Sequence, residues 1–293
     1  MKQAFITKNF RTDSLNTIET VNSILEEYLA QGFRLSLRQL YYQLVARDYI
    51  PNNLRSYKNL GNLISEARQA GMVDWSMLED RNRETQTNSH WTTPKQILES
   101  AAYSFRIDKW KDQPYHIEVM VEKDALSGVL SPVCGRLDIG ITANKGYSSS
   151  STMYEIGQRL ALQESRGKKL TILYLGDHDP SGIDMTRDVD DRLVMYSEQC
   201  EIEVVRIALN MDQVRRWNPP ENPAKETDAR FAAYSAQYGD SSWELDAIEP
   251  RQLAALVESA VIARRDDDLW AVAVEQEEAM RDELRGFARR YQN

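Results

Sequence analysis

The first third of the chain repeats apolar residues at helical spacing. This pattern predicts helices over residues 13–30, 36–47 and 56–70, with a turn at 50–53 between the second and third. Residues 72–83 then have the composition of a short extended hairpin. The N-terminal part is therefore expected to be three helices followed by a hairpin.

That order of elements is the layout of a winged-helix (CAP-like) domain, in which the third helix faces DNA. The polar side of the third helix carries the candidate DNA-binding residues Arg55, Lys58 and Arg68, with Asn59 and Asn62 beside them. Such side chains suit contacts to phosphates and bases. They equally suit a helix face that is only exposed to solvent, so the helix alone leaves both interpretations open.

From residue 116 onward, short apolar runs alternate with helical segments. The predicted strands are residues 116–121, 140–143, 170–175 and 202–208, and the helices between them are residues 125–135, 151–166 and 184–198. Apolar strands that lack polar alternation and are each followed by a helix indicate an α/β fold. We expect a parallel sheet with helices on both faces.

The helical pattern resumes around this predicted sheet, near residues 94–105, 250–264 and 267–291. Residues 82–93 are polar and have no periodicity, as in a linker. We therefore expect two domains, residues 1–93 and residues 94–293.

Charge is unevenly distributed along the 293 residues. The net charge is −9, but residues 1–110 carry a net +2 and the remainder −11. The total argues against a protein that coats DNA non-specifically, while an acidic, metal-binding part joined to a mildly basic one is compatible with a DNA enzyme. No apolar run approaches the roughly 20 residues of a membrane helix. Without a secretory signal, Cys134 and Cys200 indicate reduced thiols in a cytoplasmic protein.

Acidic residues follow two of the predicted strands. Glu122 follows the first, and Asp177 and Asp179 follow the third. Strand ends of an open α/β sheet are where ligands bind, and side chains two apart in an extended segment share a face. Carboxylates held close together repel unless a cation neutralises them, and hard oxygen ligands favour Mg²⁺ or Mn²⁺. The alternative is a pair of exposed acids in an ordinary turn. His178, between the two Asp residues, is expected to pack.

These segments resemble the Toprim domain of topoisomerases, primases and related nucleases. The matching segments are Val121-Glu122-Lys123 and Gly176-Asp177-His178-Asp179-Pro180-Ser181-Gly182. The resemblance implies Mg²⁺-dependent nucleotidyl transfer or hydrolysis, with the Glu in acid/base work or metal binding and the Asp pair on the metal. The segment Asn144-Lys145-Gly146-Tyr147-Ser148 is similar to one in the topoisomerase VI A subunit. Lys145 and Lys123 are thus candidate DNA contacts, although residues 144–148 also suit a flexible loop.

A candidate nucleophile lies in the second predicted helix. Arg38 and Tyr42 are four residues apart and share a helix face, whereas Tyr41 falls on the apolar face. A tyrosine hydroxyl has a pKa near ~10 and attacks phosphorus poorly without a neighbouring cation. Arg38 can supply that cation. The alternative is an aromatic pair that only packs the core.

The Arg-x-x-Tyr-Tyr segment ahead of a Toprim-like domain resembles the topoisomerase VI A subunit and meiotic double-strand-break protein family, in particular the short stand-alone topo mini-A proteins of mobile elements. This resemblance implies a homodimer in which Tyr42 of one subunit attacks DNA held at the other subunit's metal site. The product is a 5′-phosphotyrosyl link. Because the chain contains no ATPase module, it is not expected to drive ATP-dependent strand passage alone, and a separate ATPase partner of the B type is left open. The resemblance places the protein in the cytoplasm, on nucleoid DNA.

Two other functions suit the same residues. The acids of a Toprim-like site can activate water instead of tyrosine, as in the hydrolytic, plasmid-cutting Wadjet nuclease subunit. A non-catalytic DNA-binding module is the third possibility. Tyr238 and Trp243, in a less regular stretch, are expected to pack the core rather than form a dimer contact.

Overall fold

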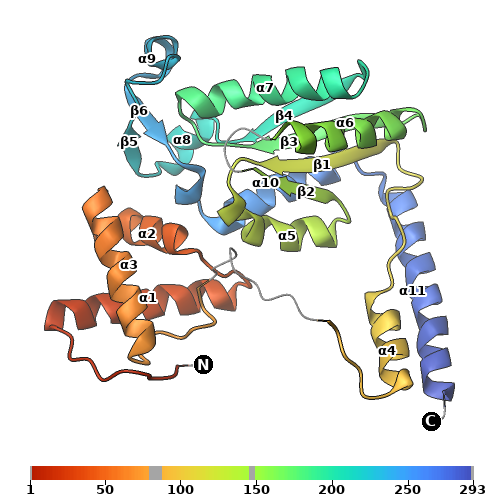
Figure 1. The fold of residues 1–293 in the computed structure, drawn as a ribbon. Coiled ribbons are helices and arrows are strands. Elements are labelled where there is room, and N and C mark those ends of the chain that lie inside the picture. Colours follow the sequence, from red (N-terminus) through yellow and green to blue (C-terminus); the bar gives the residue numbers. More distant parts are fainter. Residues whose placement is uncertain (1, 79–87, 145–148, 292–293) are drawn as a thin grey trace.

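Four parallel strands form the central sheet of the chain, in the order β2-β1-β3-β4 (Figure 1). The computed structural model describes residues 2–78, 88–144 and 149–291. The strands are β1 (Tyr115–Val121), β2 (Gly140–Ala143), β3 (Lys169–Leu175) and β4 (Ile202–Ala208). The predicted α/β class and all four predicted strands are confirmed, each to within one residue at either end.

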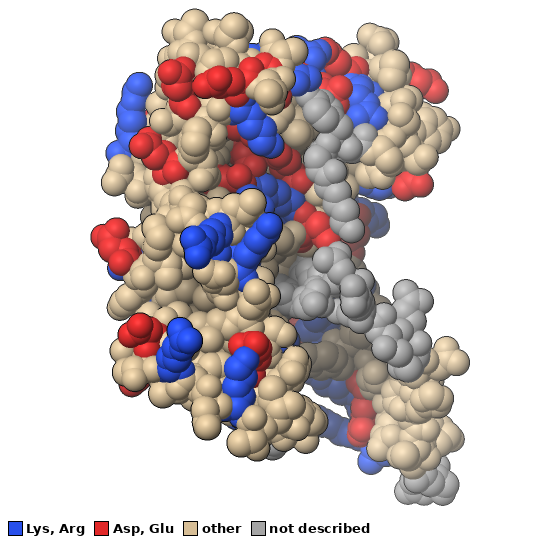
Figure 2. Space-filling view, turned by 60° about the vertical axis from the view of Figure 1, so that its left-hand side comes forward, with Lys and Arg blue, Asp and Glu red and all other residues tan. Residues whose placement is uncertain are grey.

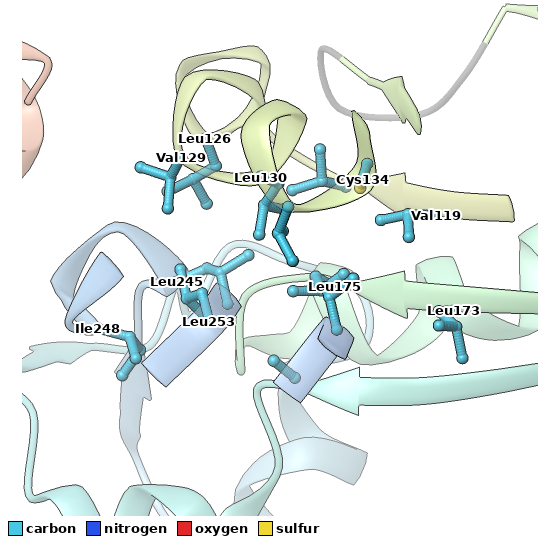
Figure 3. Packing of buried hydrophobic residues seen from close by; sticks show 14 of the residues in the cluster. Val119, Leu126, Val129, Leu130, Cys134, Leu173, Leu175, Leu245, Ile248 and Leu253 are labelled. Atoms are coloured by element: carbon cyan, nitrogen blue, oxygen red, sulfur yellow. The ribbon is translucent and has the colours of Figure 1, made fainter. Parts of the chain in front are cut away.

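Helices cover both faces of this sheet (Figure 1). On one face lie α5 (Ser127–Arg136) and α10 (Pro250–Ile262), and on the other lie α6 (Ser150–Glu164) and α7 (Pro180–Tyr196). Figure 3 shows side chains of α5 and α10 meeting those of the strands, including Leu130, Leu175 and Leu253. Burial on both faces explains why the strands are apolar without alternation.

Three helices form the N-terminal part, as predicted. They are α1 (Thr12–Ala30), α2 (Leu37–Ala46) and α3 (Leu54–Gln69), and they bury a common apolar core. Helix α2 begins where Ser36 and Gln39 cap each other's backbone N–H groups. The predicted hairpin at 72–83 lies partly outside the described residues. Its described portion consists of turns and a single bridge to Leu35.

Several short elements after β4 did not emerge from the sequence pattern. They are α8 (Met211–Trp217), β5 (Glu221–Pro223), α9 (Phe231–Tyr238) and β6 (Ser241–Trp243), followed by a 3-10 turn at Leu245–Ala247. Each of these helices and strands has eight residues or fewer, which is too short to show a clear hydrophobic period. Strands β5 and β6 pair with each other, and Trp243 pairs through its backbone with His178. This bridge joins β6 to the loop after β3.

The remaining helices pack together beside the sheet. Helix α4 (Pro94–Ser104) runs along α11 (Asp267–Arg290), far from the N-terminal helices in the view of Figure 1. The buried Glu277 of α11 pairs with Lys109, in the segment that follows α4, and with Arg281 of its own helix. Within the described ranges, no helix combines the length and apolarity required to cross a membrane.

Glu118 is a buried carboxylate inside β1 and makes the stability of the fold depend on pH. Arg159 of α6 donates to both of its oxygens, at 2.9 and 2.7 Å, and His116 Nε2 lies 3.0 Å away. Burial raises the pKa of Glu118, but Arg159 and His116 outweigh this and lower it to about 2. A lowered carboxyl pKa stabilises the fold above the ordinary value of 4.5, and the stabilisation is lost as pH falls towards 2.

We therefore expect Glu118→Gln to flatten the acid limb of the stability curve. Between pH 4.5 and 2, wild type should lose about 3 kcal/mol more stability than the variant, because each unit of pKa shift corresponds to ~1.4 kcal/mol. Urea unfolding at several pH values measures this difference. The exposed Glu155 of α6 supplies the control, Glu155→Gln. A Glu118→Gln curve parallel to wild type over this range would contradict the assignment.

Candidate functional site

The loop after β3 is held in place by Arg206, a basic residue inside the mainly apolar strand β4. Its guanidinium donates to the carbonyl oxygens of Gly176 and Asp177 on one side and of Gly182 on the other. Backbone oxygens thus surround this cation where the strand turns into α7. The sequence carried a signal for it, since an arginine within a predicted strand of apolar residues requires a specific set of acceptors if it is buried.

Glu122 stands at the end of β1 and reaches this loop directly. Its Oε2 accepts a hydrogen bond from the backbone N–H of Asp177 at 2.8 Å. The side chain is buried, and burial raises its pKa, although the Asp177 N–H opposes the shift. The structure therefore brings Glu122 against the Asp-His-Asp loop, as the shared edge of the sheet predicted.

Position 176 leaves no room for a side chain, because Glu122 and Tyr174 pack against the backbone there. A Cβ at position 176 would stand 2.9 Å from Glu122 Oε2 and 2.9 Å from a ring carbon of Tyr174. We expect Gly176→Ala to destabilise the protein by about 1–3 kcal/mol, since atoms in a packed interior yield little. Thermal or urea unfolding measures the effect. Gly286→Ala is the matched control, because a Cβ there meets nothing within 4 Å and should stabilise α11 by about 1 kcal/mol. Equal stabilities of the Gly176 variant and wild type would rule out this close packing.

Asp177 and Asp179 point to different partners. Asp177 Oδ1 accepts from the Leu245 N–H at 2.7 Å, and its Oδ2 lies 2.7 Å from Lys123 Nζ. Burial raises the pKa of Asp177 well above its ordinary value, with Lys123 opposing the shift. Asp179 Oδ1 instead caps helix α7 by accepting from the Gly182 N–H at 2.6 Å. The expectation that the two carboxylates share one face therefore does not hold, because Asp179 is recruited as a helix cap.

The predicted metal ligands Glu122, Asp177 and Asp179 are neighbours, but their carboxylates do not point toward a common metal position. Across residues 2–78, 88–144 and 149–291, no three His, Cys, Asp or Glu side chains are grouped closely enough to hold a metal ion. The chemistry of their oxygen donors does suit a metal ion. Within those ranges, Glu122 Oε1 and Asp179 Oδ2 accept no hydrogen bond, and both are hard oxygen donors of the kind Mg²⁺ and Mn²⁺ prefer.

Lys123 lies at the centre of an acidic group that the sequence analysis missed. Its Nζ contacts Glu244 and lies 3.1 Å from Asp246 Oδ2, in addition to Asp177. Burial alone lowers the pKa of Lys123, but these three carboxylates raise it above its ordinary value. The ammonium group therefore remains charged. Glu244 and Asp246 alternate with Trp243 and Leu245, a spacing that parallels Asp177 and Asp179 and was the available signal.

Helix α2, the tyrosine helix that carries Arg38 and Tyr42, faces the same acidic group. Arg38 Nη2 lies 2.8 Å from Glu244 Oε2, and Arg38 Nε lies 3.1 Å from Asp246 Oδ2. The guanidinium carbon is 5.9 Å from the centre of the Tyr42 ring, so Arg38 lies over the ring rather than on the hydroxyl. The Tyr42 hydroxyl instead accepts from Asn222 Nδ2 at 3.3 Å. The structure thus brings Arg38 and Tyr42 together with Glu244 and Asp246 of the same chain.

Tyr42 is only 4% exposed, and burial raises the pKa of its hydroxyl. A hollow of about 200 Å³ opens beside it. The hollow is lined by aromatic and amide side chains together with one leucine, one acid and one cation: Arg38, Tyr41, Tyr42, Asn52, Asn53, Leu54, Tyr57, Asn222 and Glu244. Tyr41 packs in the core as predicted, and its hydroxyl donates to Asn52 at 2.9 Å.

The predicted DNA-binding residues have different surroundings. Arg55 and Lys58 are exposed on α3, whereas Arg68 lies over the Trp75 ring and donates to the Trp75 carbonyl. Lys145 lies outside the described residues. Figure 2 shows Lys and Arg side chains interspersed with Asp and Glu over one face, rather than gathered in a single basic patch.

His178 is packed between aromatic rings, as expected. Its Nδ1 lies 2.8 Å from the Tyr234 hydroxyl, and the rings of Tyr238 and Trp243 stand at its edges. Burial lowers the pKa of His178 to about 4, so its ring is neutral at physiological pH. Trp243 is buried, in agreement with the prediction of core packing. Together these rings anchor the segment that carries Glu244 and Asp246.

Comparison with known proteins adds no assignment. No family model matches the chain, and a search of curated proteins returns no match.

Proposed function

We propose that this chain is a Mg²⁺-dependent DNA-cleaving enzyme whose nucleophile is Tyr42, with a winged-helix-like N-terminal domain and a Toprim-like α/β domain related to the topoisomerase VI A subunit. One observation carries the proposal. Arg38, four residues before Tyr42, pairs with Glu244, which also contacts Lys123, and Lys123 pairs in turn with Asp177 at the end of the parallel sheet. A tyrosine, two cations and buried carboxylates from distant parts of the chain thus meet at the edge where α/β folds bind ligands.

In the proposed reaction, the Tyr42 hydroxyl oxygen forms a bond to phosphorus and the bond from phosphorus to the 3′ oxygen breaks. The tyrosine proton passes to a carboxylate, for which Glu122 is suited because burial raises its pKa. The 3′ oxygen takes up a proton from water and leaves as a hydroxyl, and the 5′ phosphate stays on the protein. Arg38 stabilises the charge that develops on the phosphoryl oxygens. Glu122, Asp177 and Asp179 would hold Mg²⁺, which supplies Lewis-acid stabilisation of the same charge.

The homodimer and an ATPase partner remain part of this proposal. The contacts between Arg38, Glu244 and Asp246 occur within a single chain. They support a site to which both parts of one chain contribute. A second copy would add its own tyrosine for the opposite DNA strand.

A hydrolytic nuclease is the second candidate, and the surroundings of Tyr42 favour it. The tyrosine is buried and its pKa is raised, so it attacks only after the contact around it opens. Water needs no such movement, and the buried carboxylates can activate it with the same metal.

Supercoiled plasmid, incubated with the protein and Mg²⁺ and then denatured with detergent, separates these reactions. Transesterification leaves protein attached to the 5′ ends, and protease treatment releases it. Hydrolysis leaves protein-free ends. The absence of any cleavage with either Mg²⁺ or Mn²⁺ would refute the proposed activity and favour a DNA-binding module.

A further inference from the structure

Two carboxylates hold two cations from distant parts of the chain. Glu244 and Asp246 each contact both Arg38 of α2 and Lys123 after β1. Each cation is therefore neutralised by the same pair of anions. This is the main charged contact between the tyrosine helix and the α/β domain among the described residues.

A guanidinium and an ammonium placed side by side bind a phosphodiester as well as a carboxylate. Arginine presents a planar fork of donors that fits the two oxygens of either group, and lysine adds a point charge. The carboxylate oxygens of Glu244 thus occupy positions at which phosphate oxygens could receive the same donors.

The two carboxylates differ in how readily they can be replaced. The side chain of Asp246 is fully buried, at 0% exposure, whereas that of Glu244 is 25% exposed and that of Arg38 is 43% exposed. Glu244 and Arg38 also line the hollow beside Tyr42, which connects them to the surface. Glu244 can therefore move aside while Asp246 keeps its place.

We propose that Arg38 and Lys123 form a binding site for a DNA backbone phosphate, and that Glu244 occupies this site as a competing anion of the same chain until DNA displaces it. The proposal rests on the proposed function in taking DNA as the substrate. While DNA is absent, Glu244 supplies the second anion beside Arg38 and the third beside Lys123, so that both half-buried cations are neutralised. When DNA displaces Glu244, Lys123 keeps Asp177 and Asp246, whereas Arg38 keeps only Asp246 among the described residues, so Arg38 has more of its positive charge to offer a phosphate.

Removing the charge of Glu244 should therefore tighten DNA binding. Fluorescence anisotropy with a labelled duplex in EDTA measures binding without metal, so cleavage cannot contribute. We expect Glu244→Gln to lower Kd by roughly fivefold or more and to steepen its dependence on salt by about one phosphate contact. Glu244→Ala should behave in the same way, which keeps the test valid if one variant folds poorly. Thermal unfolding checks both.

Glu249→Gln is the matched control. Glu249 also joins the N-terminal helices to the α/β domain, but its partner is the Tyr28 hydroxyl rather than a cation. The variant makes the same change in net charge and should leave Kd within about twofold of wild type. This control separates local competition from a general reduction in negative charge.

Arg38→Gln completes the design. In an Arg38→Gln background, Glu244→Gln should lower the Kd for DNA only slightly. The phosphate site then lacks Arg38, so removing the charge of Glu244 frees little of the site. The inference is overturned if Glu244→Gln binds DNA no more tightly than Glu249→Gln, or if its gain is unchanged without Arg38. Cleavage assays remain independent of this result. Covalent products without a Glu244 effect would reject only this inference, and a Glu244 effect without cleavage would reject only the proposed enzyme.

Discussion

Tyr42→Phe is expected to abolish covalent attachment of the protein to DNA and to lower cleavage by at least ~10³-fold, as loss of an enzymic nucleophile does. The substitution removes one oxygen and keeps the ring that packs against Arg38 and Tyr41. The lost hydrogen bond from Asn222 is 3.3 Å long, so little stability depends on it. Detergent-denatured plasmid reactions, run with and without protease, measure both effects.

Tyr49→Phe is the control for this variant. Tyr49 belongs to the same part of the chain, shortly after α2, and its side chain is largely exposed. It should cleave and attach as wild type does. If Tyr42→Phe cuts DNA as well as wild type and no protein stays on the ends, tyrosine attack is wrong and water is the nucleophile.

Asp177→Asn is expected to remove Mg²⁺-dependent cleavage by either nucleophile, with a loss on the order of 10²–10³-fold. The amide keeps an oxygen that can accept from the Leu245 N–H, so the loop retains its shape. It removes the charge that a divalent ion requires and also one of the anions around Lys123. Initial cleavage rates over a Mg²⁺ titration, together with calorimetric Mn²⁺ binding, report the metal directly.

Asp191→Asn is the matched substitution for this test. Asp191 is exposed on α7, and its one ion pair within the described part of the chain is with Arg187, so its loss should change neither cleavage nor metal binding. An Asp177→Asn protein that binds Mn²⁺ and cleaves DNA at the wild-type rate would exclude Asp177 as a metal ligand. Such a result would leave the acidic group with the structural role of neutralising Lys123.

Much of the fold was predictable because its long elements carry strong periodic signals. Helices cover both faces of the parallel sheet, so a central strand such as residues 170–175 is a nearly continuous apolar run that can be recognised in the sequence without knowing its neighbours. The short segments between β4 and α10 were missed because their shape depends on contacts. Strand β6 exists through its pairing with β5 and with His178, not through a pattern of its own.

The candidate site divides in the same way. Glu122, Asp177 and Asp179 were located correctly at strand ends, because chain direction places the carboxyl ends of parallel strands at one edge. Their orientation was not predictable. The free N–H groups of α7 draw Asp179 into a helix cap, and Lys123 takes one oxygen of Asp177. Local backbone demands thus decide where each carboxylate points.

By itself, the sequence determined the α/β class, the strand ends that carry acids and the helix that carries Arg38 and Tyr42. These follow from local periodicity and from the geometry of parallel strands. Only the tertiary structure joined that helix to Glu244 and Asp246, through the ion pairs of Arg38, while the bridge between His178 and Trp243 holds the segment of the two acids beside the loop after β3. Residues so far apart in the chain share no periodic signal, and their charges meet because separate elements pack around one edge of the sheet.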